Sequence, residues 1–261
     1  MLNNIRVCLL SIPSLVVDSK LAVSHFLYFL IQVFVGMSSG TLEWKNNVVR
    51  IFLIYVSLIL IRELSLLLMN RASGSLFMYI FLALFILFTQ KIEEKHYITA
   101  QLGFLDVFYA STLAGLMPRY FSVMILGLTG QLVIGPPQMG ILPLLIISSI
   151  IEEIFFRACI YSNLRCFLNY KGAYLTTIIL YAFFHIPLNS LLNLLLILPI
   201  YLFSGILLQE VYLKWGLAPS IITHIVYNII GVFYVVEFSL ASVSIVSLAF
   251  IITLLLIRFL A

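Results

Sequence analysis

The chain is dominated by apolar segments that are separated by short polar breaks. Most of these segments approach the roughly 20 residues that a helix needs to cross the hydrocarbon core of a bilayer. The runs lie at about 21–36, 48–69, 75–90, 120–134, 141–164, 172–188, 191–213, 217–236 and 238–258. This pattern predicts an all-α fold, a polytopic membrane helix bundle with about eight to ten transmembrane helices.

The composition excludes a soluble globular protein. Hydrophobic residues make up 63% of the chain and charged residues 9%, whereas ordinary soluble domains have roughly 45–50% and about 25%. The net charge of +4 is spread thinly along the chain instead of forming a basic patch. We therefore expect membrane lipids, and no nucleic acid, among the partners of the chain.

The segment 104–118 leaves the number of spans open. It is apolar, but it holds Asp106 and ends at Pro118 and Arg119, so it either spans the membrane or lies along the interface. If it is interfacial, successive spans place the loops alternately on the two sides of the membrane, and Lys20 and Arg71 lie on one side. The other side then carries Lys45, Arg50, Lys91, Lys95, Arg119, Arg165, Lys171, Lys214 and Arg258. The positive-inside rule makes this second side cytoplasmic.

Three charged residues interrupt the apolar run 141–164. They are Glu152, Glu153 and Arg157. An ionisable side chain at the centre of a membrane helix costs roughly 2.5–3.5 kcal/mol even on the mild insertion scales, so by default it marks a function. Glu153 and Arg157 are four residues apart, which suits an ion pair on one helix face. Glu152 points about 100° away and is left as the candidate reacting carboxylate.

Two histidines fall at a similar depth in later runs. Glu152 lies thirteen residues before Arg165, and His185 lies thirteen residues after Gly172. At 1.5 Å per residue, both are about 20 Å from the same helical hairpin turn. His224 and Asn228 share one face of a further helix and lie about 10 and 16 Å from that side of the membrane. We therefore expect these polar side chains to converge.

Such a cluster is suited to peptide hydrolysis without a covalent intermediate. A carboxylate with an imidazole can deprotonate a water, and a second imidazole with an amide can stabilise an oxyanion. No cofactor is expected, although Glu152, His185 and His224 also make a two-histidine, one-carboxylate zinc set that lacks the HExxH spacing. Buried glutamates and histidines also occur in proton-coupled transporters, which remain an alternative.

Three sequence elements resemble the CAAX protease and bacteriocin-processing (CPBP, or Abi) family. They are Glu152-Glu153-x-x-x-Arg157, the stretch from Tyr181 to His185, and His224-x-x-x-Asn228. The stretch from Ser204 through Trp215 to Asn228 also resembles the approach to the third family motif, and the likeness covers about residues 141–236. The resemblance implies that residues 1–140 form N-terminal transmembrane helices and that residues 141–261 form the catalytic helical core, within one membrane domain.

The resemblance also implies roles for individual residues. Glu152 and His185 would activate water, while His224 and Asn228 would form the oxyanion hole. The supporting residues would be Glu153, Arg157 and Tyr181, the last standing where the family usually has Phe. The implied activity is that of an intramembrane glutamate-dependent endopeptidase.

Family members act on membrane-associated peptides or proteins, which include prenylated CAAX proteins and bacteriocins. A bacteriocin immunity protein without turnover is a further alternative. The Ile-, Leu-, Asn- and Tyr-rich composition is compatible with an AT-rich bacterial genome. We therefore expect a multi-pass protein of a bacterial plasma (inner) membrane.

Overall fold

The structure is a computed structural model, and it describes residues 55–63, 71–89, 103–133, 139–166, 168–186, 191–233, 235–236 and 239–259. All of them belong to the second of two compact units, Asn46–Ala261; the first is Met1–Lys45. The apolar run 21–36 lies outside the described residues.

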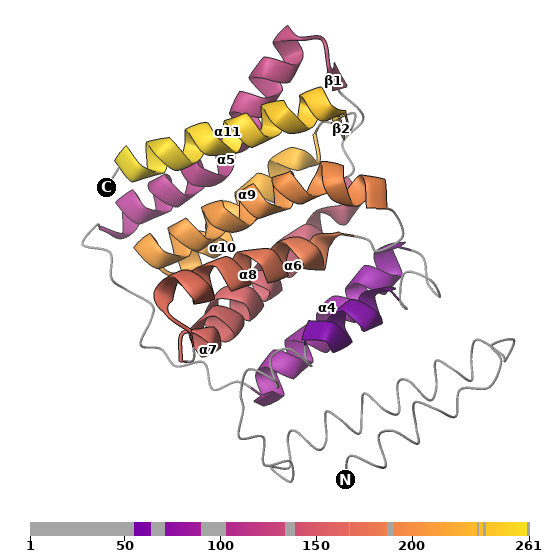
Figure 1. Cartoon of the computed structure of the whole chain (residues 1–261), viewed down its shortest axis with the longest axis vertical. Coiled ribbons are helices and arrows are strands. Elements are labelled where there is room, and N and C mark those ends of the chain that lie inside the picture. The colour runs from indigo at the N-terminus through magenta and orange to yellow at the C-terminus, as the bar shows by residue number, and fades with distance from the viewer. Residues whose placement is uncertain are drawn as a thin grey trace, which may run out of the picture. The chain divides into compact units, whose positions relative to one another are not determined.

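The described part of the chain is helical, as predicted (Figure 1). Residues 55–63 form a helix. The following helices are α4 (Arg71–Thr89), α5 (Phe104–Leu128), α6 (Leu142–Glu153), α7 (Ser162–Leu164), α8 (Tyr170–His185), α9 (Leu191–Trp215), α10 (Leu217–Gly231) and α11 (Leu240–Phe259). A 3-10 turn, η2 (Met139–Ile141), precedes α6, and a π-helix, η3 (Ile154–Tyr161), joins α6 to α7. Two short strands, β1 (Leu132–Val133) and β2 (Val235–Val236), pair antiparallel.

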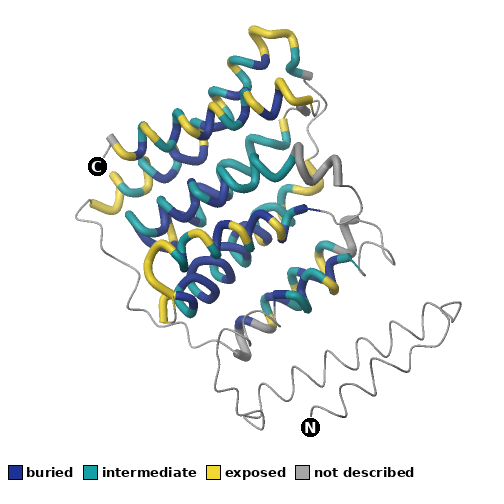
Figure 2. The backbone as a smooth tube through the Cα atoms, viewed as in Figure 1, coloured by how far each residue is buried: buried dark blue, intermediate teal, exposed yellow. Residues whose placement is uncertain are grey.

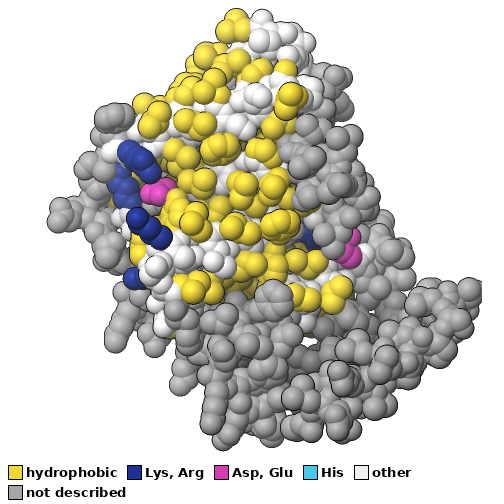
Figure 3. Space-filling view, in the orientation of Figure 1, with side chains coloured by type: hydrophobic (Ala, Val, Ile, Leu, Met, Phe, Trp, Pro, Cys, Tyr) yellow, Lys and Arg dark blue, Asp and Glu magenta, His cyan; other side chains and the backbone are white. Residues whose placement is uncertain are grey.

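Four segments of the described residues have the length and composition to cross a membrane. They are Phe104–Leu128, Met139–Leu164, Ile197–Trp215 and Leu240–Arg258. The chain is therefore an integral multi-pass membrane protein. Figure 3 agrees, because hydrophobic side chains cover most of the described face and charged side chains gather near its edges.

Helix α10 occupies the centre of the described bundle, where it packs against α5, α6 and α9. Helix α8 packs on α9, α11 on both α5 and α9, and α4 on α6. Buried residues, dark blue in Figure 2, follow the helix faces that meet one another. A hydrophobic core joins α5, α9 and α11, and its largest members are Phe250, Trp215, Leu207, Leu126 and Ile257.

Helix α5 corrects the expectation for residues 104–134. The segment 104–118 belongs to a helix that is long and apolar enough to span the membrane, but it is not separate from residues 120–128, because α5 runs without interruption from Phe104 to Leu128 with Pro118 inside it. Proline removes one backbone hydrogen bond, but membrane helices tolerate this where neighbouring helices enclose the backbone. Arg119 is consequently not a loop residue and does not belong in the charge count of the cytoplasmic side.

Four other basic residues of that count do gather at one end of the bundle. Lys214 donates to the carbonyl of Ile257, next to Arg258, over 2.8 Å. Arg165 lies over the ring of Tyr170, one residue before Lys171. Of the remaining residues of the count, Arg71 begins α4, whereas Lys20, Lys45, Arg50, Lys91 and Lys95 lie outside the described residues.

Small residues bring the central helices into close contact. A Cβ atom at Gly115 of α5 would lie 2.4 Å from the carbonyl oxygen of Thr223 in α10. A Cβ atom at Gly205 of α9 would lie 3.0 Å from the ring of Tyr181 in α8. Both contacts adjoin residues of the expected site, since Thr223 precedes His224 and Tyr181 is one turn from His185. Glycine at these two positions therefore fixes how closely the helices carrying the two histidines approach their neighbours.

Candidate active site

The acidic pair ends α6, at the point where the helix changes its hydrogen-bond pattern. Pro143 stands in the first turn of α6, where a missing N–H costs nothing. Glu152 and Glu153 are the last two residues of α6, and the π-helix η3 begins immediately after them. Wide π turns are rare and often occur at functional sites. Both glutamates are buried.

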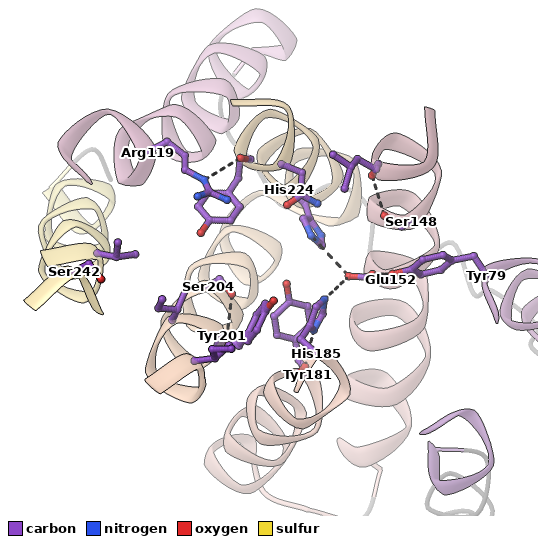
Figure 4. A pocket seen from close by; sticks show the side chains of 16 residues that line it. Tyr79, Arg119, Ser148, Glu152, Tyr181, His185, Tyr201, Ser204, His224 and Ser242 are labelled. Atoms are coloured by element: carbon purple, nitrogen blue, oxygen red, sulfur yellow. Dashed lines mark hydrogen bonds and ion pairs between the residues drawn. The ribbon is translucent and has the colours of Figure 1, made fainter. Parts of the chain in front are cut away.

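Glu152 is held from three directions by side chains of three other helices. Tyr79 of α4 donates its hydroxyl to Oε1. The Nε2 atom of His185, at the end of α8, lies 3.1 Å from Oε2. The Nε2 atom of His224, on α10, lies 3.8 Å from the same oxygen. The expected convergence of Glu152, His185 and His224 is confirmed, and Figure 4 shows both imidazoles directed at the carboxylate.

The hydrogen bonds of His185 show which atoms of the His185–Glu152 pair carry hydrogens. Its Nδ1 lies 2.9 Å from the backbone carbonyl oxygen of Tyr181. A carbonyl oxygen only accepts, so Nδ1 carries a hydrogen. The 3.1 Å contact between Nε2 and Oε2 then requires one further proton, on the imidazole or on the carboxyl group. Glu152 and His185 therefore share a proton at the cavity wall.

Glu153 has a separate set of partners inside the protein. The Nη1 atom of Arg157 lies 3.2 Å from Oε1, which confirms the predicted i,i+4 ion pair. The hydroxyl of Ser220 donates to Oε2 over 2.5 Å, and Nδ1 of His224 lies 2.8 Å from Oε1. The side chains of Glu153 and Arg157 are completely buried. His224 therefore stands between the two carboxylates and contacts both.

Arg157 and Tyr181 support this arrangement. The guanidinium carbon of Arg157 lies 4.6 Å from the centre of the Tyr181 ring, and Nη2 lies 3.4 Å from the carbonyl oxygen of Gly205. The Tyr181 ring in turn contacts the imidazole of His185, with centroids 4.5 Å apart. The aromatic ring at position 181 thus packs between the buried ion pair and the partly exposed imidazole of His185.

Asn228 also reaches the site. It lies one turn after His224 on α10, and its amide donates to the hydroxyl of Ser149 over 3.0 Å. The hydroxyl of Ser149 in turn donates to the backbone carbonyl of Leu145 over 2.7 Å. Asn228 lines the same cavity as Glu152, His185 and His224. The four residues predicted for the chemistry therefore share one cavity.

This cavity has a volume of about 440 Å³. Its wall is built from α4, α5, α6, α8, α9, α10 and α11 and is lined by polar and apolar side chains together. A volume of this size suits a small ligand or a short piece of peptide. A carboxylate, two imidazoles and an amide that line one cavity are suited to acid–base chemistry on a bound amide.

Sequence reasoning missed three residues near the site. Tyr79 and Arg119 line the cavity from α4 and α5. Arg62, which pairs with Glu63, also donates to the backbone carbonyls of Phe184 and Ile186 on either side of His185. The signal for Arg62 was its charge within an apolar run, whereas Tyr79 stands among ordinary apolar residues and gives no signal.

The geometry gives no support to the zinc set. The two histidines of this set, His185 and His224, each contact Glu152 directly. Throughout the described part of the chain, no group of three His, Cys, Asp or Glu side chains is arranged to hold a metal ion.

Comparison with known proteins identifies the region that holds the acidic pair and both histidines. Residues 136–230 match the model of the Rce1-like family, the type II CAAX prenyl endopeptidase Rce1-like proteins. No curated protein and no solved structure matches the chain. The buried network of Glu152, Glu153 and His224 is consistent with a catalytic site of such a protein. Residues 136–230 are therefore a domain of the Rce1-like type II CAAX prenyl endopeptidase family, a family of peptidases.

Proposed function

We propose that this chain is an intramembrane endopeptidase that hydrolyses a peptide bond of a membrane-associated substrate by glutamate-dependent water activation. One observation carries the proposal. The Oε2 atom of Glu152 lies 3.1 and 3.8 Å from the Nε2 atoms of His185 and His224, at the wall of a cavity.

In the proposed reaction, Glu152 and His185 together act as the general base. A water on the cavity side of Oε2 gives one proton to this pair as its oxygen bonds to the scissile carbonyl carbon. When the C–N bond breaks, the pair returns that proton to the leaving nitrogen. The second hydrogen of the water stays with the new carboxyl group, so the pair ends the cycle unchanged.

His224 and Asn228 stabilise the negative charge of the tetrahedral intermediate. In this role the imidazole of His224 carries a hydrogen on both ring nitrogens, donating from Nδ1 to Glu153 and from Nε2 to the oxyanion. The amide of Asn228 is a second donor from the same helix face. Donors fixed before the reaction are effective because no reorganisation is needed as the charge develops.

The remaining predicted residues position this machinery. Glu153, Arg157 and Ser220 hold the Nδ1 side of His224, and Tyr181 holds the Nδ1 side of His185. Tyr79 binds the second oxygen of Glu152 and so turns Oε2 toward the imidazoles. These residues act through others and not on the substrate.

We further propose that residues 141–261 form the catalytic core and that residues 1–140 add N-terminal transmembrane helices. In that arrangement α4 and α5 complete the cavity, since they contribute Tyr79 and Arg119. The proposed substrate is a membrane-bound peptide or protein, with a prenylated substrate as one case. The proposed location is the plasma (inner) membrane of a bacterium.

The test is cleavage of a library of quenched fluorescent peptides, farnesylated ones included, by the purified protein in detergent. Glu152→Gln should abolish cleavage. Glu210→Gln is the matched control, because Glu210 also accepts a tyrosine hydroxyl, that of Tyr174 at 2.7 Å, but does not line the cavity. Cleavage should be insensitive to a chelator. Full activity of Glu152→Gln would contradict the proposal, and loss of activity with chelator would overturn its metal-free chemistry.

A further inference from the structure

Arg119 places a permanent positive charge on the wall of the cavity. We propose that this guanidinium binds a carboxylate of the peptide substrate and so orients the peptide relative to Glu152. The inference rests on the proposed function for the identity of the ligand as a peptide. It adds a specificity-determining residue that lies outside the matched range 136–230.

The guanidinium is held in a defined position. Its carbon lies 3.8 Å from the centre of the Tyr227 ring, and Nε donates to the backbone carbonyl of Tyr227 over 3.2 Å. Gly231 leaves space beside it, since a Cβ atom there would lie 2.7 Å from Nη2. Stacking on an aromatic face restricts the position of the guanidinium.

The position within α5 makes the charge expensive. Arg119 lies near the middle of the membrane-spanning segment Phe104–Leu128. Arginine at such a depth costs about 2.5–3.5 kcal/mol or more, and buried membrane arginines usually face a cavity or a pathway. Arg119 lines the cavity that holds Glu152. The charge therefore belongs to the functional volume and not to the lipid face.

The charges of the cavity wall are separated. Among the described residues that line it, Glu152 is the one acidic side chain and Arg119 the one guanidinium. Figure 4 shows Arg119 and Ser242 on the side of the cavity away from Glu152. A bound carboxylate would be attracted to the guanidinium of Arg119. An anionic peptide would therefore bind with its carboxylate on the Arg119 side of the cavity.

A carboxylate is the ligand chemistry that fits best. Guanidinium groups bind carboxylates through paired, charge-assisted hydrogen bonds. A volume of about 440 Å³ admits a short peptide segment. The carboxylate can be the C-terminus of the peptide or an Asp or Glu side chain close to the scissile bond. These two sources share one chemistry and can be separated by experiment.

The experiment measures binding and cleavage separately. The probe is the library peptide that the protein binds most tightly, made with a free or amidated C-terminus and, independently, with Asp or Asn beside the scissile bond. Binding is measured by fluorescence anisotropy with the non-cleaving Glu152→Gln protein, and kcat/KM is measured with the wild type. Neutralising the recognised carboxylate should weaken binding and lower kcat/KM by about 10- to 100-fold.

Variants of Arg119 test the residue itself. Arg119→Gln should lose the same 10- to 100-fold on the carboxylate peptide, as expected for a charge-assisted bond, and should no longer distinguish it from the neutral peptide. Arg119→Lys should keep part of the preference. Arg165→Gln is the matched control, because Arg165 also lies over a tyrosine ring, that of Tyr170 at 5.5 Å, but does not line the cavity.

Each outcome is decisive. Equal binding of all four peptides by the protein, or an unchanged preference in Arg119→Gln, would overturn the inference. If Arg119→Gln fails to fold, the four-peptide comparison with unsubstituted Arg119 still decides. Carboxylate-dependent binding without cleavage would support the role of Arg119 and contradict the proposed peptidase. Cleavage that shows no preference for a carboxylate would support the proposed peptidase and contradict the role of Arg119.

Discussion

Glu152 and Glu153 are adjacent in sequence, but their surroundings differ in kind. Glu152 faces a cavity and contacts His185, whose side chain is 17% exposed. Glu153 faces the protein interior and contacts Arg157, whose side chain is completely buried. One carboxylate therefore borders the cavity and the other does not. Two adjacent acids at the end of one helix thus divide into one that lines the cavity and one that belongs to the buried packing.

The largest expected effect on activity comes from removing the imidazole of His185, which contacts Glu152 at the cavity wall. His185→Gln should lower kcat by about 10²- to 10⁴-fold, the usual contribution of general acid–base catalysis. Its thermal unfolding in detergent should change little, because the imidazole borders the cavity. Activity above a tenth of wild type would show that His185 takes no part in proton transfer.

Substitution of the buried ion pair of Glu153 and Arg157 should lower the stability of the protein. Arg157→Met leaves Glu153 buried without its cation, and breaking a buried ion pair costs about 3–5 kcal/mol. We expect a clearly lowered unfolding temperature in detergent. The double variant Glu153→Gln with Arg157→Met is the control and should recover part of the loss. An unfolding temperature equal to that of the wild type would contradict the structural role of the pair.

Asn228→Ala should remove one donor to the oxyanion. Loss of such a donor typically lowers kcat by about 10²- to 10³-fold, and KM should stay near its wild-type value. Ser149→Ala removes only the group to which Asn228 donates and serves as the control. A change in KM alone would mean that Asn228 binds substrate in its ground state.

Tyr79→Phe should give the smallest effect. It removes the hydroxyl that holds Oε1 of Glu152, and one hydrogen bond to a charged group is worth about 1.5–3 kcal/mol. We expect about a tenfold lower kcat with little change in KM. Tyr174→Phe, which breaks the corresponding bond to Glu210, should leave kcat unchanged. Equal effects of the two variants would indicate a general loss of packing instead of a role at Glu152.

The part of the site that follows from helix geometry could be predicted from the sequence. Equal distances from one hairpin turn placed Glu152 beside His185, and their atoms lie 3.1 Å apart. Four-residue spacing predicted the pair of Glu153 and Arg157, which is also present. These predictions succeed because the rise and the angle per residue of a helix are nearly constant.

Contacts between helices distant in sequence could not be predicted in this way. Tyr79 meets Glu152 across α4 and α6, 73 residues apart in sequence, and one tyrosine in an apolar stripe carries no mark of its partner. Arg119 was assigned to a loop because Pro118 resembles a helix end. The surrounding helices instead allow α5 to continue through that proline.

The most direct test compares the two isosteric glutamine variants of the acidic pair. Peptide cleavage and thermal unfolding would be measured on Glu152→Gln and Glu153→Gln under the same conditions. We expect that Glu152→Gln abolishes cleavage with little change in unfolding temperature, whereas Glu153→Gln clearly lowers the unfolding temperature. Retained cleavage by a well-folded Glu152→Gln protein would contradict the central role of this carboxylate.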